Sequence, residues 1–526
     1  MRDFHHPGRS AVFAANGMCA TSHPLAAKAA IDMLERGGNA ADAAVAAAVI
    51  LGLAEPQMAG LGGDCFALVS PPGTEDILAL NGTGHAPHGL GSEILRRDGH
   101  DIMPSNSAHA VTVPGAVAGF CALSERFGSL GLAAALAPAI RYADEGIPVA
   151  PRVARDWRAG AEKLGEGGRS HYLNRGAPFE VGQIFRAPGQ AEVLRRIADQ
   201  GPAGFYEGET AADMVTSLRA MGGAHTLDDF AQTEAVWGTA ISGPYRGVDL
   251  IEHPPNGAGA AVLLMAGILE NFDLGVLDPL GPERAHLEAE AMKLAVDARN
   301  RFVADANHVT RLDHMTDPST AAALARLIDR KHAMPAPAEL SEAVHRETVY
   351  LSVVDRDRMV VSLIYSIFHD FGSGLASSKY GILFHNRGAG FSLAPGHPNE
   401  VGPGKRPAHT ILPAMTKENG VITSSFGVMG GAYQPNGQLR VLTNIQDFGM
   451  DPQTAIDAPR TFPDAGKLKV ERGYPETVRR ALEDLGHAVD IPDAPIGGAQ
   501  MVRIDPKSGV LEGASDPRKD GCALGY

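Results

Sequence analysis

The chain has 526 residues, which is enough for a large core or several domains. It carries 46 Lys and Arg against 61 Asp and Glu, and the net charge of −15 argues against a general nucleic-acid-binding protein, which needs a basic surface. Apolar residues make up 44% of the chain, and 62 glycines and 36 prolines indicate many tight turns rather than disorder.

Short sequence patterns exclude further classes. No CxxC spacing occurs, so neither a disulfide framework nor a zinc site is predicted from Cys19, Cys65, Cys121 and Cys522. The N-terminal segment MRDFHHPGRSAVFA has no continuous apolar stretch, which argues against a signal peptide. The alanine-rich run Ala40–Leu53 is shorter than the about 18 apolar residues of a membrane span. We therefore expect a cytoplasmic protein that does not cross a membrane.

The N-terminal region predicts two helices. The first begins near Ser22 and Pro24 and ends at a Gly-Gly pair, because Ser caps helices, Pro suits the first turn and Gly ends them. The second runs from Asn39 to just before Glu55, and its alanines permit close approach to a sheet. We interpret Asn39, Asp42 and Glu55 as cap and buried polar residues; a role in a functional site is the alternative.

The middle of the chain alternates between helical and extended patterns. Helices are predicted at 114–127, 130–145, 151–164, 189–200, 209–221, 227–231, 258–271 and 282–302, and strands at 65–70, 236–242 and 248–253. The glycine-rich turn at 60–63 lacks a following Lys-Ser/Thr and GxGxxG spacing, so a turn is favoured over a phosphate loop. His85 follows the predicted strand end ALNGTG and either faces a pocket or lies in a surface turn.

The most informative stretch is ETVYLSVVDRDRMVVSLIYSIFHDFGSG, which begins at Glu347. Tyr350–Asp355 and Met359–Ile364 predict a hairpin with a charged turn, preceded by Thr348. A free N-terminal Thr is both nucleophile and base, since its own α-amine takes the hydroxyl proton. An internal Thr reaches this state by attacking the preceding carbonyl, here that of Glu347. The alternative is a Thr at a strand edge, where Thr is common.

Two segments flank this stretch. The Pro/Ala-rich segment 332–342 is either a flexible lead-in to a cleavage site or an ordinary linker. Further on, the predicted strand Val421–Phe426 leads to Gly430 and Gly431. Two glycine N–H groups can converge on one oxygen and form an oxyanion hole, where each donor contributes about 3–4 kcal/mol in acyl transfer. A simple turn is the alternative.

Together these motifs resemble the γ-glutamyltranspeptidase family of N-terminal-nucleophile hydrolases, from about residue 17 to the C-terminus. The match rests on SHPLA, GGNAADA, EP and GLGG near the N-terminus, on the segment that opens at Thr348, and on GASDPR near the C-terminus. The resemblance implies an α/β fold, the four-layer αββα sandwich, with one core shared by two autoproteolytic pieces, 1–347 and 348–526. Tyr350 departs from the family's histidine at that position.

The resemblance also implies roles for individual residues. Thr348 would be the nucleophile, Ser366 its hydrogen-bonding partner, and Gly430 and Gly431 the oxyanion hole, with cleavage between Glu347 and Thr348. The positions that would contact the substrate are Thr83, His85, Asn386, Arg387, His409 and Thr410.

The chain departs from γ-glutamyl-specific relatives at two substrate-binding positions. Thr83 stands where they carry an arginine for the substrate's α-carboxylate, and Gly390 where they carry an acid for its α-amine. Because unpaired buried charges are costly, such sites discriminate strongly. We therefore expect amide hydrolysis of a small acyl group with a carboxylate but no α-amine, with Arg387 and His409 as carboxylate partners. This is the branch of glutaryl-cephalosporin acylases and oxamate amidohydrolases.

Two alternatives stay open: a true γ-glutamyl hydrolase or transpeptidase acting on glutathione-like substrates, and an unprocessed, non-catalytic ligand-binding relative. No cofactor or metal is expected, since the 20 histidines are scattered and HExxH is absent. The expected partners are a small-molecule amide substrate and the two pieces of the chain itself, without nucleic acid or membrane. The sequence leaves a homo-oligomer open.

Overall fold

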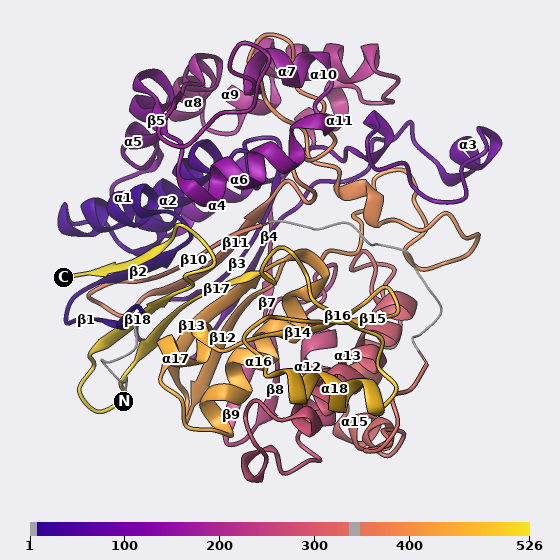
Figure 1. Ribbon diagram of the computed structural model, residues 1–526. Helices are drawn as coiled ribbons and strands as arrows, with labels where there is room; N and C mark the ends of the chain where they lie inside the picture. Colours follow the sequence, from indigo (N-terminus) through magenta and orange to yellow (C-terminus); the bar gives the residue numbers. More distant parts are fainter. Residues whose placement is uncertain (1–7, 336–347) are drawn as a thin grey trace.

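Two seven-stranded antiparallel sheets form the centre of the molecule (Figure 1). The computed structural model describes residues 8–335 and 348–526. The sheets lie face to face, and helices cover the outer side of each, which gives the layers helix, sheet, sheet and helix. The predicted four-layer α/β sandwich is confirmed.

The first sheet holds the predicted hairpin at its centre. In spatial order its strands are β19 (Cys522–Gly525), β2 (Met18–Thr21), β10 (Val349–Val354), β11 (Val360–Ser366), β3 (Asp64–Ser70), β4 (Leu78–Gly82) and β7 (Val236–Thr239). All residues of β10, β11 and β3 are buried. Strands covered on both faces have nearly continuous apolar sequences, which is the pattern that predicted this hairpin.

The second sheet packs against the first. Its strands are, in order, β1 (Val12–Ala14), β18 (Leu511–Ser515), β17 (Gly498–Ile504), β13 (Val421–Met429), β12 (Pro413–Glu418), β9 (Val248–Glu252) and β8 (Ile241–Tyr245). Smaller sheets are formed by β14 (Thr461–Asp464), β15 (Lys467–Val470) and β16 (Val489–Asp490), and by β5 (Ile147–Pro148) and β6 (Ile184–Phe185).

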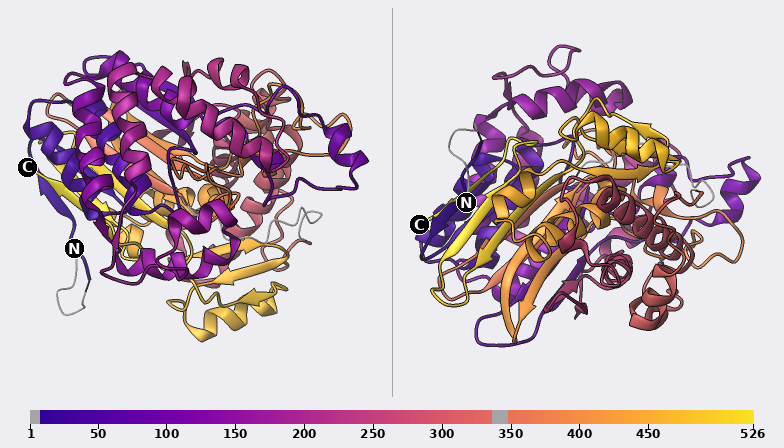
Figure 2. Two further views of the ribbon diagram at one scale, coloured as in Figure 1. Left: turned by 90° about the horizontal axis from the view of Figure 1, so that it is seen from above. Right: turned by 60° about the horizontal axis from the view of Figure 1, so that its bottom comes forward.

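Helices from the first half of the chain cover the first sheet (Figure 2, left). They include α1 (Pro24–Glu35), α2 (Ala40–Ala54), α4 (Ala116–Phe127), α5 (Leu132–Glu145), α8 (Pro188–Gln200), α9 (Ala203–Tyr206) and α10 (Gly208–Ala220). Shorter or more peripheral helices are α3 (Ser92–Arg97), α6 (Pro151–Gly160), α7 (Glu166–Tyr172) and α11 (Leu227–Ala231).

A second helical layer covers the other sheet. Its members are α12 (Gly259–Leu269), α13 (Pro282–Phe302), α14 (Leu312–Thr316), α15 (Pro318–Ala325), α16 (Gln434–Gln446), α17 (Pro452–Asp457) and α18 (Glu476–Asp484). None of the helices within residues 8–335 and 348–526 is long and apolar enough to cross a membrane.

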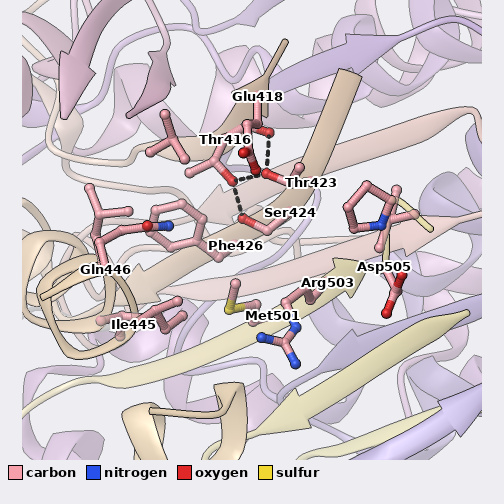
Figure 3. Close-up of a pocket in the computed structure, with 15 residues that line it drawn as sticks. Thr416, Glu418, Thr423, Ser424, Phe426, Ile445, Gln446, Met501, Arg503 and Asp505 are labelled. Atoms are coloured by element: carbon pink, nitrogen blue, oxygen red, sulfur yellow. Dashed lines mark hydrogen bonds between the residues drawn. The ribbon is translucent and has the colours of Figure 1, made fainter. Parts of the chain in front are cut away.

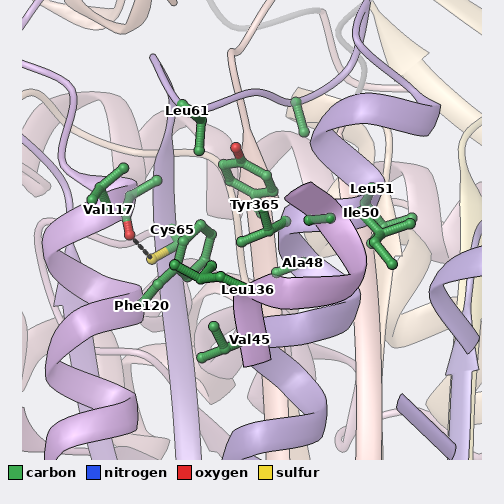
Figure 4. Packing of buried hydrophobic residues seen from close by; sticks show 14 of the residues in the cluster. Val45, Ala48, Ile50, Leu51, Leu61, Cys65, Val117, Phe120, Leu136 and Tyr365 are labelled. Atoms are coloured by element: carbon green, nitrogen blue, oxygen red, sulfur yellow. Dashed lines mark hydrogen bonds between the residues drawn. The ribbon is translucent and has the colours of Figure 1, made fainter. Parts of the chain in front are cut away.

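The alanine-rich helix α2 forms the centre of the larger core. Every residue of α2 is buried, and Figure 4 shows Val45 and Ala48 of this helix beside Tyr365 and Cys65 of the first sheet. Small side chains permit this close approach, as the sequence predicts. Asn39 caps the helix by accepting hydrogen bonds from two backbone N–H groups of the first turn, and Asp42 completes a capping box.

The predicted strand 236–242 is wrong in one respect, because it belongs to two sheets. Residues 236–239 form β7 in the first sheet, the chain passes between the sheets at Ala240, and β8 begins in the second sheet at Ile241. The extended pattern continues through the crossing, so a local pattern does not reveal it. The short helices α7, α14 and α15 were also missed; α7 lies in a Gly-rich stretch, and α15 begins at Pro318.

Tyr350 of β10 packs between the two sheets, over Gly427 of β13. Its hydroxyl forms hydrogen bonds with the Ser362 hydroxyl at 2.7 Å and the Ser425 hydroxyl at 3.4 Å. Ser352 donates to the same Ser425 oxygen at 2.7 Å. A β-carbon added at Gly427 would lie 2.4 Å from the Tyr350 ring, so this close contact between the sheets requires glycine.

We therefore predict that Gly427→Ala lowers the free energy of unfolding, measured in urea, by about 1–3 kcal/mol, because overpacking forces the Tyr350 ring or β13 to shift. Gly238→Ala on β7 is the matched control, since a β-carbon there meets nothing within 4 Å. Its effect should stay within about 0.5 kcal/mol. Equal losses in the two variants would contradict this packing.

Candidate active site

Predicted site residues gather at one end of the first sheet. The last row that spans β10, β11, β3 and β4 consists of Val349, Tyr365, Cys65 and Gly82. One position further out stand Thr348, Ser366, Asp64 and Thr83. Since side chains alternate between the faces of a strand, these four share the face that Phe66, Ile364 and Tyr350 present to the second sheet.

Thr348 is only 1% exposed, and both sheets contribute to its surroundings. Its hydroxyl donates to the Ser366 Oγ at 3.3 Å, and Ser366 Oγ also accepts from the Phe368 N–H at 2.8 Å. From the second sheet's helix α16, the Gln434 amide donates to the Thr348 oxygen at 3.5 Å. Glu347, the other side of the predicted cleavage site, lies outside the described residues.

Gly430 and Gly431 lie between β13 and the residue that contacts Thr348. Their φ angles are 125° and 56°, in the region that favours glycine. The one-turn helix Gly431–Tyr433 follows and leads directly into Gln434, the first residue of α16. The pair thus lies within a few residues of Gln434, which contacts the Thr348 hydroxyl.

Asp64 connects several of the loops at this end of the sheet. Its Oδ1 accepts from the N–H groups of Gly84 at 3.1 Å and Gly115 at 3.2 Å. Its Oδ2 lies 3.1 Å from His385 Nδ1, within ion-pair distance but outside hydrogen-bond geometry. The same Oδ2 is 3.3 Å from His409 Nε2. All three side chains are fully buried.

The electrostatics of this group follow from burial and charge. Burial raises the pKa of the Asp64 carboxyl, but His385 and His409 outweigh this effect and hold the pKa well below its ordinary value. Burial, with the nearby Arg387 cation, lowers the pKa of His409 to about 3 despite Asp64. At neutral pH the site therefore contains an ionised Asp64 beside a neutral His409.

Arg387 and Thr410 come together as a pair. Arg387 is fully buried and donates to the Thr410 hydroxyl at 3.1 Å. Its guanidinium carbon lies 3.9 Å from the centre of the Phe368 ring, which is cation–π geometry. The neighbouring Asn386 amide donates to the Ser105 carbonyl at 3.0 Å and contacts His369 Nδ1 at 2.7 Å.

Thr83 and His85 are both buried, so His85 does not lie in a surface turn. The Thr83 hydroxyl donates to Asn81 Oδ1 at 2.6 Å, and the Thr83 carbonyl accepts from Arg406 Nε at 2.9 Å. His85 Nδ1 lies 3.1 Å from the Ala86 carbonyl oxygen, and burial lowers the His85 pKa. A cation thus stands beside Thr83, although position 83 itself carries none.

Two other features lie away from Thr348. A cavity of about 360 Å³ opens at the β12–β13 hairpin, whereas Gly430 follows the opposite end of β13. Figure 3 shows apolar Phe426 and Met501 facing a group of hydroxyls that includes Thr416. The cavity is therefore separate from the predicted nucleophile.

A possible metal-binding cluster occurs on the second sheet's helical layer. Within the described residues, His286, Glu290 and His487 place potential ligand atoms within 4.8 Å of one another. These atoms already have protein partners: His286 Nδ1 lies 2.8 Å from His487 Nε2, and Glu290 accepts from Lys293 at 2.7 Å. No sequence motif predicts this cluster, because His487 is distant in the chain.

Comparison with known families decides the identity of the fold. A family model described as gamma-glutamyltranspeptidase matches residues 26–526. The chain belongs to this family.

Relatives that match over nearly the full length of the chain support this family assignment. The chain is 34% identical to the glutathione hydrolase-like YwrD proenzyme of Bacillus subtilis, over 97% of this chain and 98% of that protein. It is 33% identical to the oxamate amidohydrolase proenzyme of Klebsiella pneumoniae, over 97% and 98%. The crystal structure of cephalosporin acylase from Bacillus halodurans matches with a TM-score of 0.93 and 36% identity, over 100% of this chain and 99% of that one. The family and these relatives support a self-processing amidohydrolase or transpeptidase of the N-terminal-nucleophile type.

Sequence reasoning missed three residues that lie beside the predicted site residues: Gln434, Asp64 and His385. Gln434 follows directly after the predicted oxyanion glycines, so its position carried a signal. Asp64 is an acidic residue at the first position of a fully buried strand, which is unusual enough to indicate a special role. His385 has no local signal, because its proximity to Asp64 arises only from the fold.

We predict that Ser366→Ala slows both self-cleavage and amide hydrolysis by about 10- to 100-fold, since it removes the hydrogen-bond acceptor that orients the Thr348 hydroxyl. Ser366→Thr retains that oxygen and should stay within about threefold of the native rates. Cleavage is followed on denaturing gels and hydrolysis by kcat. Native rates in the alanine variant would rule out this role for Ser366.

Proposed function

We propose that this protein is a self-processing amidohydrolase that cleaves amides of a small, carboxylate-bearing acyl group through a threonyl ester. The observation that carries the proposal is the buried Thr348 hydroxyl, which donates to Ser366 and accepts a hydrogen bond from Gln434. The proposed pieces are residues 1–347 and 348–526.

Self-processing uses the Thr348 hydroxyl first. The Thr348 oxygen attacks the Glu347 carbonyl, the peptide C–N bond breaks, and the acyl group is transferred to oxygen while the nitrogen becomes a free amine. Water then hydrolyses the ester, which leaves a carboxylate on Glu347 and restores the Thr348 hydroxyl. The result is an N-terminal threonine with its own base.

Substrate hydrolysis repeats the chemistry on an external amide. The Thr348 α-amine takes the hydroxyl proton as the oxygen attacks the substrate carbonyl, and the same proton goes to the leaving amine as the C–N bond breaks. The N–H groups of Gly430 and Gly431 would stabilise the oxyanion, by about 3–4 kcal/mol per donor. Water then releases the acid, with the α-amine as base.

The acyl specificity follows from the charges at the site. Arg387 is a buried cation beside Thr410, and a buried arginine suits bidentate binding of a carboxylate. His409 is neutral near pH 7, so it would add no positive charge for the carboxylate, and Arg387 would be the cationic partner. Gly390 offers no acid for an α-amine. The name of the oxamate amidohydrolase relative agrees with such an acyl group, because oxamate carries a carboxylate.

A true γ-glutamyl hydrolase or transpeptidase is the second candidate. Arg406 donates to the Thr83 carbonyl, so a cation lies near the position where γ-glutamyl-specific relatives place their arginine. One relative is named glutathione hydrolase-like. This candidate needs a partner for the α-amine, which position 390 does not supply.

We predict that the native protein migrates as two bands and that the smaller piece has Thr348 as its N-terminal residue. Thr348→Ala should stay full-length and inactive, because no hydroxyl can attack Glu347 or the substrate. Thr348→Ser keeps a hydroxyl and should still be processed. A persistent single band of the native chain would instead indicate a non-catalytic relative.

A substrate panel tests the acyl group. We predict that glutaryl-p-nitroanilide or oxamate is hydrolysed with kcat/KM at least about tenfold above that for γ-glutamyl-p-nitroanilide, because the α-ammonium group would be buried without a partner. Butyryl-p-nitroanilide, which lacks the carboxylate, is the neutral control. Faster turnover of the γ-glutamyl compound would favour the second candidate.

A further inference from the structure

We propose that Asp64 is a positioning residue for acyl recognition: it holds the three segments that carry the predicted substrate-binding residues in place beside Ser366. This inference rests on the proposed function. No sequence pattern assigns such a role to Asp64. The residue faces the same space between the sheets as Thr348 and pairs with Ser366 across the β3–β11 ladder.

Each contact of the Asp64 carboxylate reaches a different part of the site. Gly84, which donates to Oδ1, lies between Thr83 and His85. His385 immediately precedes Asn386 and Arg387, and His409 immediately precedes Thr410. The contacts therefore lead to all of the predicted substrate-binding positions, namely Thr83, His85, Asn386, Arg387, His409 and Thr410.

The geometry leaves these segments little freedom. A β-carbon added at Gly84 would lie 1.4 Å from the Val113 carbonyl oxygen, so the Gly84 loop touches the segment that also supplies Gly115. His385 Nε2, the ring nitrogen that faces away from Asp64, lies 2.8 Å from the Thr112 carbonyl oxygen. The His385 ring is therefore held at both of its nitrogens. Movement of either loop would separate a fully buried carboxylate from its partners, which is costly.

The orientation of His409 follows from the same carboxylate. His409 Nε2 faces Asp64, so it carries the proton, and Nδ1 accepts from the Ile411 N–H at 3.4 Å. Both nitrogens of this ring are thus committed to the protein. The ring then acts as a spacer that places Thr410, whose hydroxyl accepts from Arg387.

Asp64 and the Arg387–Thr410 hydrogen bond therefore link the same two segments, 385–387 and 409–410. Loss of the Asp64 charge would remove one of these links and let the Arg387 cation shift. Displacements of about 1 Å at a binding group are enough to weaken its interaction strongly. Amides whose acyl group binds that cation should be hydrolysed with a lower kcat/KM, whereas kcat/KM for amides of a neutral acyl group should change much less.

The test compares Asp64→Asn with the native protein, both as processed two-piece enzymes. For glutaryl-p-nitroanilide we expect kcat/KM to fall about tenfold or more, mainly through KM, because binding of the carboxylate is lost in ground and transition state alike. For butyryl-p-nitroanilide we expect a fall of less than about threefold. The ratio of kcat/KM for glutaryl-p-nitroanilide to kcat/KM for butyryl-p-nitroanilide should therefore fall.

Asp42→Asn is the matched control. Asp42 is also a fully buried carboxylate, and it accepts from the N–H groups of Asn39 at 3.0 Å and Ser129 at 2.9 Å, at the start of α2. This variant should lower thermal stability and leave the acyl preference unchanged. Equal losses for both acyl groups in Asp64→Asn, or no loss, would overturn the inference.

A second variant tests the same inference if Asp64→Asn does not fold. His385→Gln removes an imidazole from Asp64 and leaves the backbone hydrogen bonds to Gly84 and Gly115, and we expect it to narrow the same preference. An unchanged preference in this variant would likewise overturn the inference. Failure of the proposed function is distinct, because it would show in the native enzyme as no preference for glutaryl over butyryl.

Discussion

Backbone hydrogen bonds fix the β10–β11 hairpin between β2 and β3, at the centre of the first sheet. Because all residues of β10 and β11 are buried, neither strand can leave the sheet without exposing unpaired N–H and C=O groups to an apolar interior. The proposed cleavage lies immediately before β10. It would therefore create a new chain terminus without loosening the strand that carries it, and the two pieces would keep one core.

Side-chain alternation then determines what that terminus meets. Thr348, Ser366 and Asp64 all point into the space between the sheets, where a buried apolar cluster that includes Phe66 and Met429 lies directly behind them. The second sheet contributes Gln434 and the preceding glycines from its own end. In such a buried site, hydrogen bonds and charges act with little screening. The proposed nucleophile thus precedes a strand of one sheet, and the proposed oxyanion donors follow a strand of the other.

The sequence predicts those parts of this arrangement that depend on local patterns. The bounds of α13, the buried helix α2 and the β10–β11 hairpin follow from periodicity and caps. The contact of Thr348 with Ser366 was inferred from resemblance, and the hairpin register, which pairs Val349 with Tyr365, brings the two residues together. The junction of β7 and β8 and the contacts of Asp64 with His385 and His409 could not be predicted, because they join segments that only the tertiary fold brings together.

The Tyr350 position illustrates how a departure from a family pattern can be structural. Tyr350 is two residues from Thr348 and shares its face, yet its hydroxyl turns to Ser362 and Ser425, and its ring fills the gap above Gly427. Since a buried phenol needs a polar partner, the serines of β11 and β13 compensate for it. The hydroxyl of Thr348 instead forms hydrogen bonds with Ser366 and Gln434. The tyrosine therefore belongs to the packing between the sheets, and the chemistry proposed for Thr348 does not depend on a histidine at position 350.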